Sequence, residues 1–509
     1  MVAENPKGIG QRHFLAFWLF TGLAIEFGSR FSIFVTIVAM VGSNKTEIVN
    51  FHATPNGTCP LPSFANNTES IEQLTSGEFD WDHATQGYIL SAFFYSYLLI
   101  MFPGGLLIRK FGVRLLMGIS IGGSSIFSLL VPFCARIDPL ALVFIRILQG
   151  LFAGVVYPGS YHIVASWVPE QEKTVFVSIA LFCSSSVGTI LSAQLSGFLC
   201  EHGFAGGWPS VFYIFGIAGF IWSIGWFICV RDTPRKHPWI SEEEKLYIEE
   251  NCHVVNDNKS FSDVPWNQIF ASGPFWGIVA AHYCYNWAFY TTFASLPTYF
   301  KDVLHLPPTM NGLAISLPHI VLTVSMSTTG VLADILRKCL STRAVRIMYY
   351  DFGLIVTVTF FMLIIYAECN LILIGIFLSI SFFGMGISLN GFGVNHLDIA
   401  PRYASIMMAF SNTIGNIPGL ASPIITGFII NEESNFDSWK KVFLINAGVC
   451  SIGVLMFSLL AHGDVQSWAH KKGEVDASKE ENEQALQHDE YRSRTSTLNV
   501  AVVEPLLEH

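Results

Sequence analysis

Two charged residues, Glu26 and Arg30, lie in the apolar stretch "FWLFTGLAIEFGSRFSIFVTIVAMV", which is otherwise free of charge from Phe14 to Val41. Residues four apart on a helix share nearly the same face, so a carboxylate and a guanidinium at this spacing can pair. Burying either charge in an apolar span is costly, and such residues usually face a cavity or a partner. The pair therefore predicts a buried polar site for an ion or a charged ligand.

A second buried charge is expected at Arg146 in "RILQGLFAGVVYPGSY". A guanidinium presents a planar fork of donors that suits carboxylate or phosphate groups. The chain has no GxSxG with a plausible partner set, no phosphate-binding loop, no HExxH and no CxxC or His/Cys metal spacing. We therefore predict neither an enzyme nor a metal or cofactor site. Any uphill transport by this chain must be driven by an ion gradient and not by nucleotide hydrolysis.

The elements that position these residues follow from composition. The 509 residues are 51% hydrophobic, 14% aromatic and only 13% charged, about half the charged fraction of an ordinary soluble domain. Apolar windows long enough to cross a bilayer core of about 30 Å recur throughout. They predict twelve membrane-spanning helices near residues 14–41, 86–108, 114–135, 139–165, 174–199, 208–230, 272–300, 309–335, 344–367, 371–396, 403–430 and 440–463.

Charge in the loops predicts the orientation. The short connections after the even-numbered spans carry arginine and lysine, which places them and both termini in the cytosol. The opposite loop 42–85 holds three glycosylation sequons, at Asn44, Asn56 and Asn66, which are modified only on the luminal or extracellular side. The net charge of -10 lies largely in solvated segments and says little about a ligand.

A charged, proline-containing segment separates two sets of six spans, and the halves share short sequence echoes at an offset near 226 residues, which indicates a duplicated unit. The expected organisation is a cytosolic N-terminus (1–13), an N-terminal six-helix bundle (14–230), a cytosolic central loop (231–271), a C-terminal bundle (272–463) and a cytosolic tail (464–509). Ten cysteines are spread singly. Cys59 could bond to Cys134, Cys200 or Cys369, or remain free, and the sequence does not choose.

Several segments resemble the anion:cation symporter family of the major facilitator superfamily, which includes sialin, the vesicular glutamate transporters and the type I sodium-phosphate cotransporters. They are "FDWDHATQGYILSAFFYSYLLIMFPGG", "RILQGLFAGVVYPGSY", "GWPSVFYIFGIAG", "AHYCYNWAFYTTFASLPTYFKDVL" and "VNHLDIAPRYASIM". The likeness covers about residues 14–468 and is greatest to sialin-like members, because the glutamate transporters have arginine where this chain has Tyr285. It implies an all-α membrane protein with two six-helix bundles that alternate access to a central site for anions.

The resemblance also implies roles for residues. Arg30 and Arg146 match substrate-linked arginines of the family, whereas Gln149 and Ala153 stand where the family often has proton-coupling glutamates. We therefore predict that Glu26 has taken over coupling, pairing with Arg30 when ionised and releasing it when protonated or when a cation binds. The alternative is a static pair that only neutralises Arg30.

Other candidates complete the predicted site. The substrate-binding set is Arg30, Arg146, Tyr285, Asn286, Tyr161, which replaces a family histidine, and Asn412, with Tyr290 and Asn416 as further cavity candidates. The predicted gating residues are Asp334, Arg337, His396, Asp398 and Arg402. His282 and His319 are interpreted as hydrogen-bonded core histidines.

The function predicted from these features is secondary active transport of a small organic anion, such as an acidic sugar or another monocarboxylate, coupled to H⁺ or Na⁺. Sodium-dependent phosphate or urate-type transport, an anion channel, and a transport-dead receptor of the same fold are the alternatives. We expect no cofactor beyond the coupling cation and no nucleic-acid partner. We expect the protein to be a monomer in the bilayer. The plasma membrane and a lysosomal or vesicular membrane both remain open.

Overall fold

The computed structural model describes residues 10–41, 59, 77–169, 176, 178–252, 264–400, 403–431 and 434–469. These residues form helices and the turns between them, apart from one isolated bridge of Val41 with Phe79. The helices are α1 (Gln11–Met40), α4 (His83–Phe111), α5 (Val113–Ile137), α6 (Pro139–Ala153), α7 (Val156–Trp167), η3 (Ser178–Cys183), α9 (Ser184–His202), α10 (Pro209–Cys229), η4 (Pro234–Lys236), α11 (Glu242–Asn251), α12 (Trp266–Ala271), α13 (Gly273–Asp302), α14 (Pro308–Leu336), α15 (Thr342–Leu363), η6 (Ile364–Ala367), α16 (Leu371–Phe392), α17 (Asn395–Ile399), α18 (Ala404–Gly415), α19 (Ile417–Ile429), α20 (Phe436–Leu460) and η8 (Ser467–Ala469).

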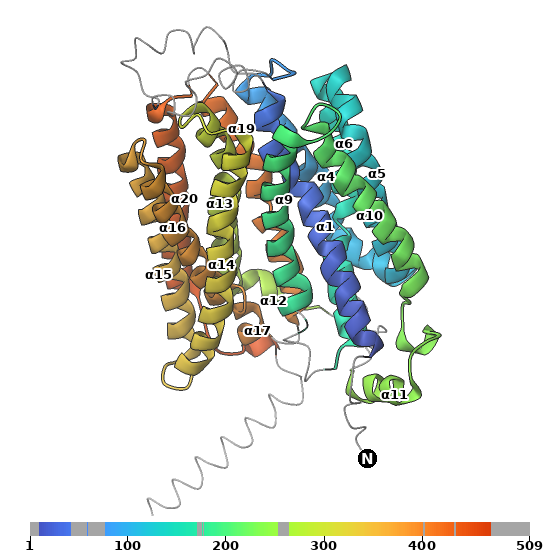
Figure 1. Ribbon diagram of the computed structural model, residues 1–509. Helices are drawn as coiled ribbons and strands as arrows, with labels where there is room; N and C mark the ends of the chain where they lie inside the picture. The colour runs from blue at the N-terminus through green and yellow to red at the C-terminus, as the bar shows by residue number, and fades with distance from the viewer. Residues whose placement is uncertain are drawn as a thin grey trace, which may run out of the picture.

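Most of these helices run the length of the molecule side by side (Figure 1). Within the described residues, nine helical segments, some of them interrupted, are long and apolar enough to span a bilayer. The spans at α4 and α13, of 29 and 30 residues, and the broken span α18–α19 complete the twelve. The expected all-α membrane fold with twelve spans is confirmed.

The helices pack in two sets. In the first, α10 packs on α5 and α4 packs on α6; in the second, α16 packs on α14 and α15, and α13 on α20. The two sets meet mainly where α9 lies along α14 and where α4 lies along α19 (Figure 1). The site discussed below lies between the sets, at α1 and α13.

One end of the bundle carries a disulfide between Cys59 and Cys369, with the Cα atoms 5.5 Å apart; we call it the disulfide end. Among the open alternatives for Cys59, the structure selects Cys369, which lies just before α16 in the other half of the chain. Cys134 and Cys200 are free thiols. The opposite end, where α11 lies, is called the α11 end.

The two halves are closed against each other at the disulfide end. The Thr309 amide donates to a Glu201 carboxylate oxygen at 2.8 Å, and the Ala84 amide donates to Asn431 Oδ1 at 3.1 Å. Gly197 allows α9 to approach α14 closely, because a Cβ there would lie 2.6 Å from the Pro308 carbonyl oxygen. These contacts hold the two halves together at this end.

At the α11 end, the segment between the halves is partly helical. Ser241 caps α11, whose Glu244 accepts hydrogen bonds from the Gln11 and Arg12 amides at 2.8 and 3.1 Å. The same carboxylate pairs with the buried Arg12 guanidinium at 3.2 Å. A carboxylate at a helix N-terminus satisfies free amide donors and complements the helix dipole, so Glu244 anchors the first turn of α1.

Three spans are interrupted near the centre or the α11 end. The breaks fall at Gly154 and Val155 between α6 and α7, at Gly393 and Val394 between α16 and α17, and at Asn416 between α18 and α19. A break frees backbone carbonyl groups from the helical ladder, which leaves them able to accept from side chains of neighbouring helices.

Candidate functional site

Arg30 lies inside an aromatic shell between the two halves. Its side chain is 4% exposed, and its Cζ atom lies 4.5 Å from the centre of the Tyr97 ring, 4.7 Å from that of Phe94 and 4.8 Å from that of Phe93. One guanidinium nitrogen donates to the Tyr290 hydroxyl of the other half at 3.0 Å, whereas Nε has no hydrogen-bond partner. Aromatic faces attract a cation without neutralising it, so Arg30 keeps its positive charge and a free donor.

Arg146 on α6 lies beside Arg30. It is 1% exposed and donates to Gln149 Oε1 at 2.8 Å and to the Arg30 carbonyl oxygen at 3.1 Å, while its Nε lacks a partner. Gln149 is therefore a neutral partner at the position where the family often has an acid. Because an amide does not balance a guanidinium charge, the two arginines leave excess positive charge at this depth.

Glu26 does not form the expected ion pair with Arg30. Among the described residues the two side chains are not within 4.0 Å of each other, and Glu26 Oε1 is buried without a hydrogen-bond partner. The Glu26 side chain is 6% exposed. Arg30 instead bonds to the Tyr290 hydroxyl.

The second half contributes a polar face on α13. Tyr290 donates to Asn416 Oδ1 at 2.6 Å, and Asn416 Nδ2 donates to the Asn412 carbonyl oxygen at 2.7 Å. Asn286 Nδ2 donates to the Gly415 carbonyl oxygen at 2.7 Å, using a group freed by the break before α19. Of the predicted substrate residues, Asn412 thus joins the network that contacts Arg30, and Asn286 bonds to the backbone of Gly415 beside Asn416.

Two predicted substrate residues lie apart from this network. Tyr285 is buried against Phe392, with ring centres 5.3 Å apart, on the α16 side of α13. Tyr161 lies 6.2 Å from Tyr157, measured between ring centres. Tyr157 in turn lies 6.1 Å from Phe27 and 3.4 Å from the Ser185 hydroxyl, so it is nearer to the Arg30 shell than Tyr161 is.

The aromatic shell itself was missed from the sequence. Phe93 and Tyr97 are four residues apart on α4, which places them on one face, and this spacing is visible in "SAFFYSY". However, the chain holds 43 phenylalanines and 16 tyrosines, so the pattern does not stand out. Only the packing of α4 against α1 distinguishes these rings.

The predicted gating residues separate into an internal clamp and a buried hydroxyl contact. Asp398 accepts from Arg346 in a two-point contact at 2.7 and 3.2 Å, and Arg337 lies 3.8 Å away. This clamp joins α15 to α17 within one half. Arg346, which was not among the predicted gating residues, is the main partner of Asp398. His396 contacts the Ser411 hydroxyl at 2.8 Å.

Some predicted residues fall outside the description. The sequons at Asn44, Asn56 and Asn66, the gating residue Arg402 and the side chain of Asp334 lie outside the residues and side chains that the structure describes.

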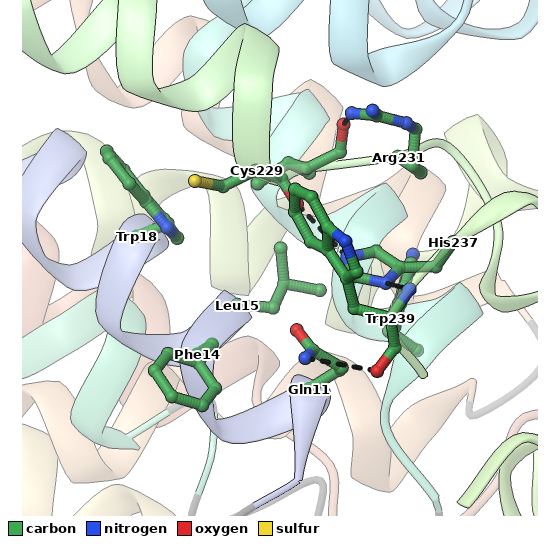
Figure 2. A pocket seen from close by; sticks show the side chains of 10 residues that line it. Gln11, Phe14, Leu15, Trp18, Cys229, Arg231, His237 and Trp239 are labelled. Carbon is green, nitrogen blue, oxygen red and sulfur yellow. Dashed lines mark hydrogen bonds between the residues drawn. The ribbon is translucent and has the colours of Figure 1, made fainter. Parts of the chain in front are cut away.

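A cavity of about 190 Å³ lies elsewhere, at the α11 end of the first half (Figure 2). Its wall includes Phe14, Trp18, Arg231, His237 and Trp239, where the start of α1 meets the end of α10. None of its lining residues belongs to the Arg30 network. We therefore assign the candidate site from the buried charges and their contacts, and not from this cavity.

Comparison with known proteins defines the class of the chain. The family model described as Major Facilitator Superfamily matches residues 19–423. The structure resembles that of a bacterial homologue of the human lysosomal transporter Spinster in an inward-facing, unoccupied conformation, with a TM-score of 0.65 at 12% identity over 90% of this chain and 98% of that one. It also resembles the nucleoside transporter NupG, with a TM-score of 0.58 at 12% identity over 87% of this chain and 99% of that one. The fold is that of the major facilitator superfamily.

Relatives define the family more closely. Sialin of Homo sapiens is 36% identical over 468 residues, covering 91% of this chain and 92% of sialin. Vesicular glutamate transporter 3 of Danio rerio is 34% identical over 476 residues, covering 92% of this chain and 76% of that protein. The chain belongs to the anion:cation symporter family and is a multi-pass membrane transporter.

Proposed function

We propose that this protein moves a small organic anion across a membrane by alternating access, driven by a proton or sodium gradient. Its relatives are transporters whose names include vesicular glutamate transporters, and an acidic sugar or another monocarboxylate is the proposed substrate class. The binding group is the pair Arg30 and Arg146, with Tyr290, Asn286 and Asn412 on the facing half.

One observation carries the proposal: two guanidinium groups are buried side by side without an ion-paired carboxylate. Arg30 and Arg146 are 4% and 1% exposed, and each has an unsatisfied Nε. Buried charges without compensation are destabilising, so a protein retains them where a ligand supplies the opposite charge. A carboxylate can accept two parallel hydrogen bonds from a guanidinium, which matches these free donors.

Closure at the disulfide end supports the alternating-access part of the proposal. The hydrogen bonds that Glu201 and Asn431 accept join the halves at that end, and Arg30 of α1 bonds to Tyr290 of α13 across the halves. A rocking of the halves about the central site would break the first set and open this end. Arg30 and Tyr290 would separate in the same movement.

Coupling is assigned to Glu26. Its carboxylate is buried one helical turn from Arg30 and lacks a partner on Oε1. A buried carboxylate that is neither paired nor hydrogen-bonded is more stable when protonated or when it binds a cation. We propose that Glu26 holds the coupling cation while Arg30 is free for substrate, and pairs with Arg30 after the cation leaves.

The proposed orientation places the disulfide end in the lumen or outside the cell and both termini in the cytosol. Disulfides persist in oxidising compartments, and Cys59, which bonds to Cys369, belongs to the sequence segment 42–85 that also holds the three sequons. The basic connections after the even-numbered spans lie at the other end. The membrane is either the plasma membrane or that of a lysosome or vesicle.

The test is uptake into proteoliposomes of radiolabelled glucuronate, N-acetylneuraminate, glutamate, urate and phosphate under separate proton and sodium gradients. Uphill accumulation of a carboxylate under one gradient is the expected result. Flux without uphill accumulation would identify a channel, and binding without flux would identify a receptor. Accumulation of phosphate or urate alone, driven by sodium, would favour the other transporter class.

Two variants test the assigned roles. Arg30→Gln is expected to abolish accumulation, with Arg235→Gln as a control because Arg235 is a solvent-exposed arginine paired with Glu249. Glu26→Gln is expected to remove the dependence on the cation gradient while substrate exchange continues. Full gradient dependence in Glu26→Gln would leave Glu26 as a structural neighbour of Arg30.

A further inference from the structure

Two buried histidines of the second half share one hydroxyl group. His282 Nδ1 on α13 lies 3.3 Å from Ser411 Oγ on α18, and His396 Nε2 on α17 lies 2.8 Å from the same oxygen. All three side chains are buried, with exposures of 7%, 0% and 2% for His282, Ser411 and His396. Histidine is the side chain that most readily binds and releases protons near neutral pH.

The contacts select one arrangement of hydrogens. His396 Nδ1 faces the Gly393 carbonyl oxygen at 3.3 Å, and a carbonyl only accepts, so this nitrogen carries a proton. In neutral His396, Nε2 then accepts the single hydroxyl proton of Ser411 at 2.8 Å, which is a shorter contact than the 3.2 Å from Ser411 Oγ to its other acceptor, the Met408 carbonyl oxygen. His282 Nδ1 must therefore donate to Ser411 Oγ, and the result is a directed chain from His282 through Ser411 to His396.

We propose that His282, Ser411 and His396 form a proton relay that carries the coupling proton between the central site and the α11 end. The proposal rests on the transport function proposed above and selects the proton as the coupling cation. A proton that binds His282 Nε2 makes an imidazolium, and its Nδ1–H bond breaks as that proton passes to Ser411 Oγ. The Ser411 proton passes at the same time to His396 Nε2, and the His396 imidazolium releases its Nδ1 proton toward the α11 end.

This step conserves protons and needs no other reactant. One proton enters at His282 and one leaves at His396, and no electrons are transferred. The passage leaves each histidine with its proton on the other nitrogen and the Ser411 hydroxyl reversed. Rotation of the imidazole rings and of the hydroxyl, or return of a proton in the opposite direction, restores the first arrangement.

The relay is aligned with the candidate site. His282, Asn286 and Tyr290 follow at four-residue intervals on one face of α13, and each bonds to α18 or the break that follows it. Tyr290 contacts Arg30, so His282 lies about 12 Å from this contact toward the α11 end. Glu26 precedes Arg30 by one turn of α1, and α1 runs in the same direction as α13. Glu26 therefore lies at a depth between the Arg30–Tyr290 contact and His282, about one helical turn from the depth of His282.

The charged groups nearest to the relay are in contact with one another. Asp398 follows His396 by two residues, and its carboxylate is held by Arg346 and lies 3.8 Å from Arg337. On the side of His282, Phe392 and Gly415 contact the ring. Titratable side chains near His282 on the helices that pack here include Cys284 and Tyr285 on α13, Tyr350 on α15, whose hydroxyl donates to the Ala281 carbonyl oxygen, and Cys450 on α20, and none of these four is a base that accepts protons near neutral pH. Asp351 on α15 accepts from the Ser458 hydroxyl of α20.

The test compares Ser411→Ala with Ser411→Thr and wild type in proteoliposomes that carry an imposed pH gradient, with glucuronate, N-acetylneuraminate, glutamate, urate and phosphate as probes. Net proton-driven uptake requires protons to cross, whereas exchange of labelled for unlabelled anion at equal pH does not. We expect Ser411→Ala to lower net uptake about tenfold or more while exchange stays within about twofold, because an interrupted proton transfer slows the step it serves. Ser411→Thr keeps the hydroxyl and should retain both rates.

A second variant covers the case in which Ser411→Ala does not fold. His396→Gln can accept from Ser411 and donate to the Gly393 carbonyl, but it cannot carry a proton, so it separates relay from packing. Net uptake and exchange that fall in parallel, or that both stay unchanged, would overturn the relay. Wild-type protein that accumulates none of the probes under a pH gradient would instead overturn the proposed proton-coupled transport itself.

Discussion

Tyr290→Phe removes one hydroxyl that joins the two halves. That hydroxyl accepts from Arg30 at 3.0 Å and donates to Asn416 at 2.6 Å, and both partners are buried. A hydrogen bond to a charged group contributes about 1.5–3 kcal/mol and a neutral one about 0.5–1.5 kcal/mol. Only the bond to Arg30 crosses between the halves, because Asn416 belongs to the same half as Tyr290 and keeps its bond in any conformation. The closed arrangement should therefore lose about 1.5–3 kcal/mol relative to a conformation in which Arg30 and Tyr290 are apart, or about 10- to 160-fold in population.

Hydrogen exchange followed by mass spectrometry measures this change. The amide of Thr309 donates to Glu201 at the closed end, and peptides that contain it should exchange faster in Tyr290→Phe, up to the same factor. Tyr285→Phe is the matched control, since it makes the same substitution on the same helix at a ring that packs on Phe392. Unchanged exchange around Thr309, or equal acceleration in both variants, would refute the role of Tyr290 in holding the halves together.

Three further predictions concern stability. Glu244→Gln should lower the thermal unfolding temperature, because it weakens the cap on α1 and breaks a buried ion pair, changes worth about 0.5–2 and about 3–5 kcal/mol respectively; an unchanged unfolding temperature would show that the anchor is dispensable. Cys369→Ser should leave Cys59 free to react with a maleimide without reduction, which raises the count of reactive thiols by one, whereas a count one lower than that of wild type would contradict the disulfide. The guanidinium of Arg136 lowers the pKa of Glu78, so this exposed pair stabilises the fold above the ordinary pKa of a glutamate and loses its effect as pH falls through the lowered value. Arg136→Gln should remove this part of the pH dependence, about 0.2–1 kcal/mol between thermal melts at pH 7 and at a pH below the lowered pKa of Glu78, and an unchanged profile would exclude the pair.

Local sequence patterns were sufficient for the fold because each pattern acts within one helix. Apolar windows identify spans that must satisfy their own backbone hydrogen bonds in lipid, and this holds without knowledge of the neighbouring helices. Arg30 and Arg146 stood out for the same reason, since a charge in an apolar window is costly wherever its neighbours lie. The family resemblance, confirmed by the comparisons, drew on residues that were equally visible in the chain.

Contacts between residues that are far apart in the sequence could not be predicted in this way. The four-residue spacing of Glu26 and Arg30 allows a pair on one helix, yet Arg30 bonds to Tyr290, which is 260 residues away. Helical spacing states which groups can meet, whereas the packing of α1 against α13 and α4 decides which contact has the lower free energy. The same holds for Cys59 and Cys369, which are separated by 310 residues.

The sequence alone therefore determined that this is a twelve-span anion transporter of a known family with charges buried near its centre. The tertiary structure decided how those charges are balanced, which end of the bundle is closed, and that His282 and His396 meet at one hydroxyl. Burial and helical period are properties of a single segment, so they can be read along the chain. Hydrogen bonds between buried groups depend on the rotation and depth of several helices at once, and only their packing in three dimensions sets these.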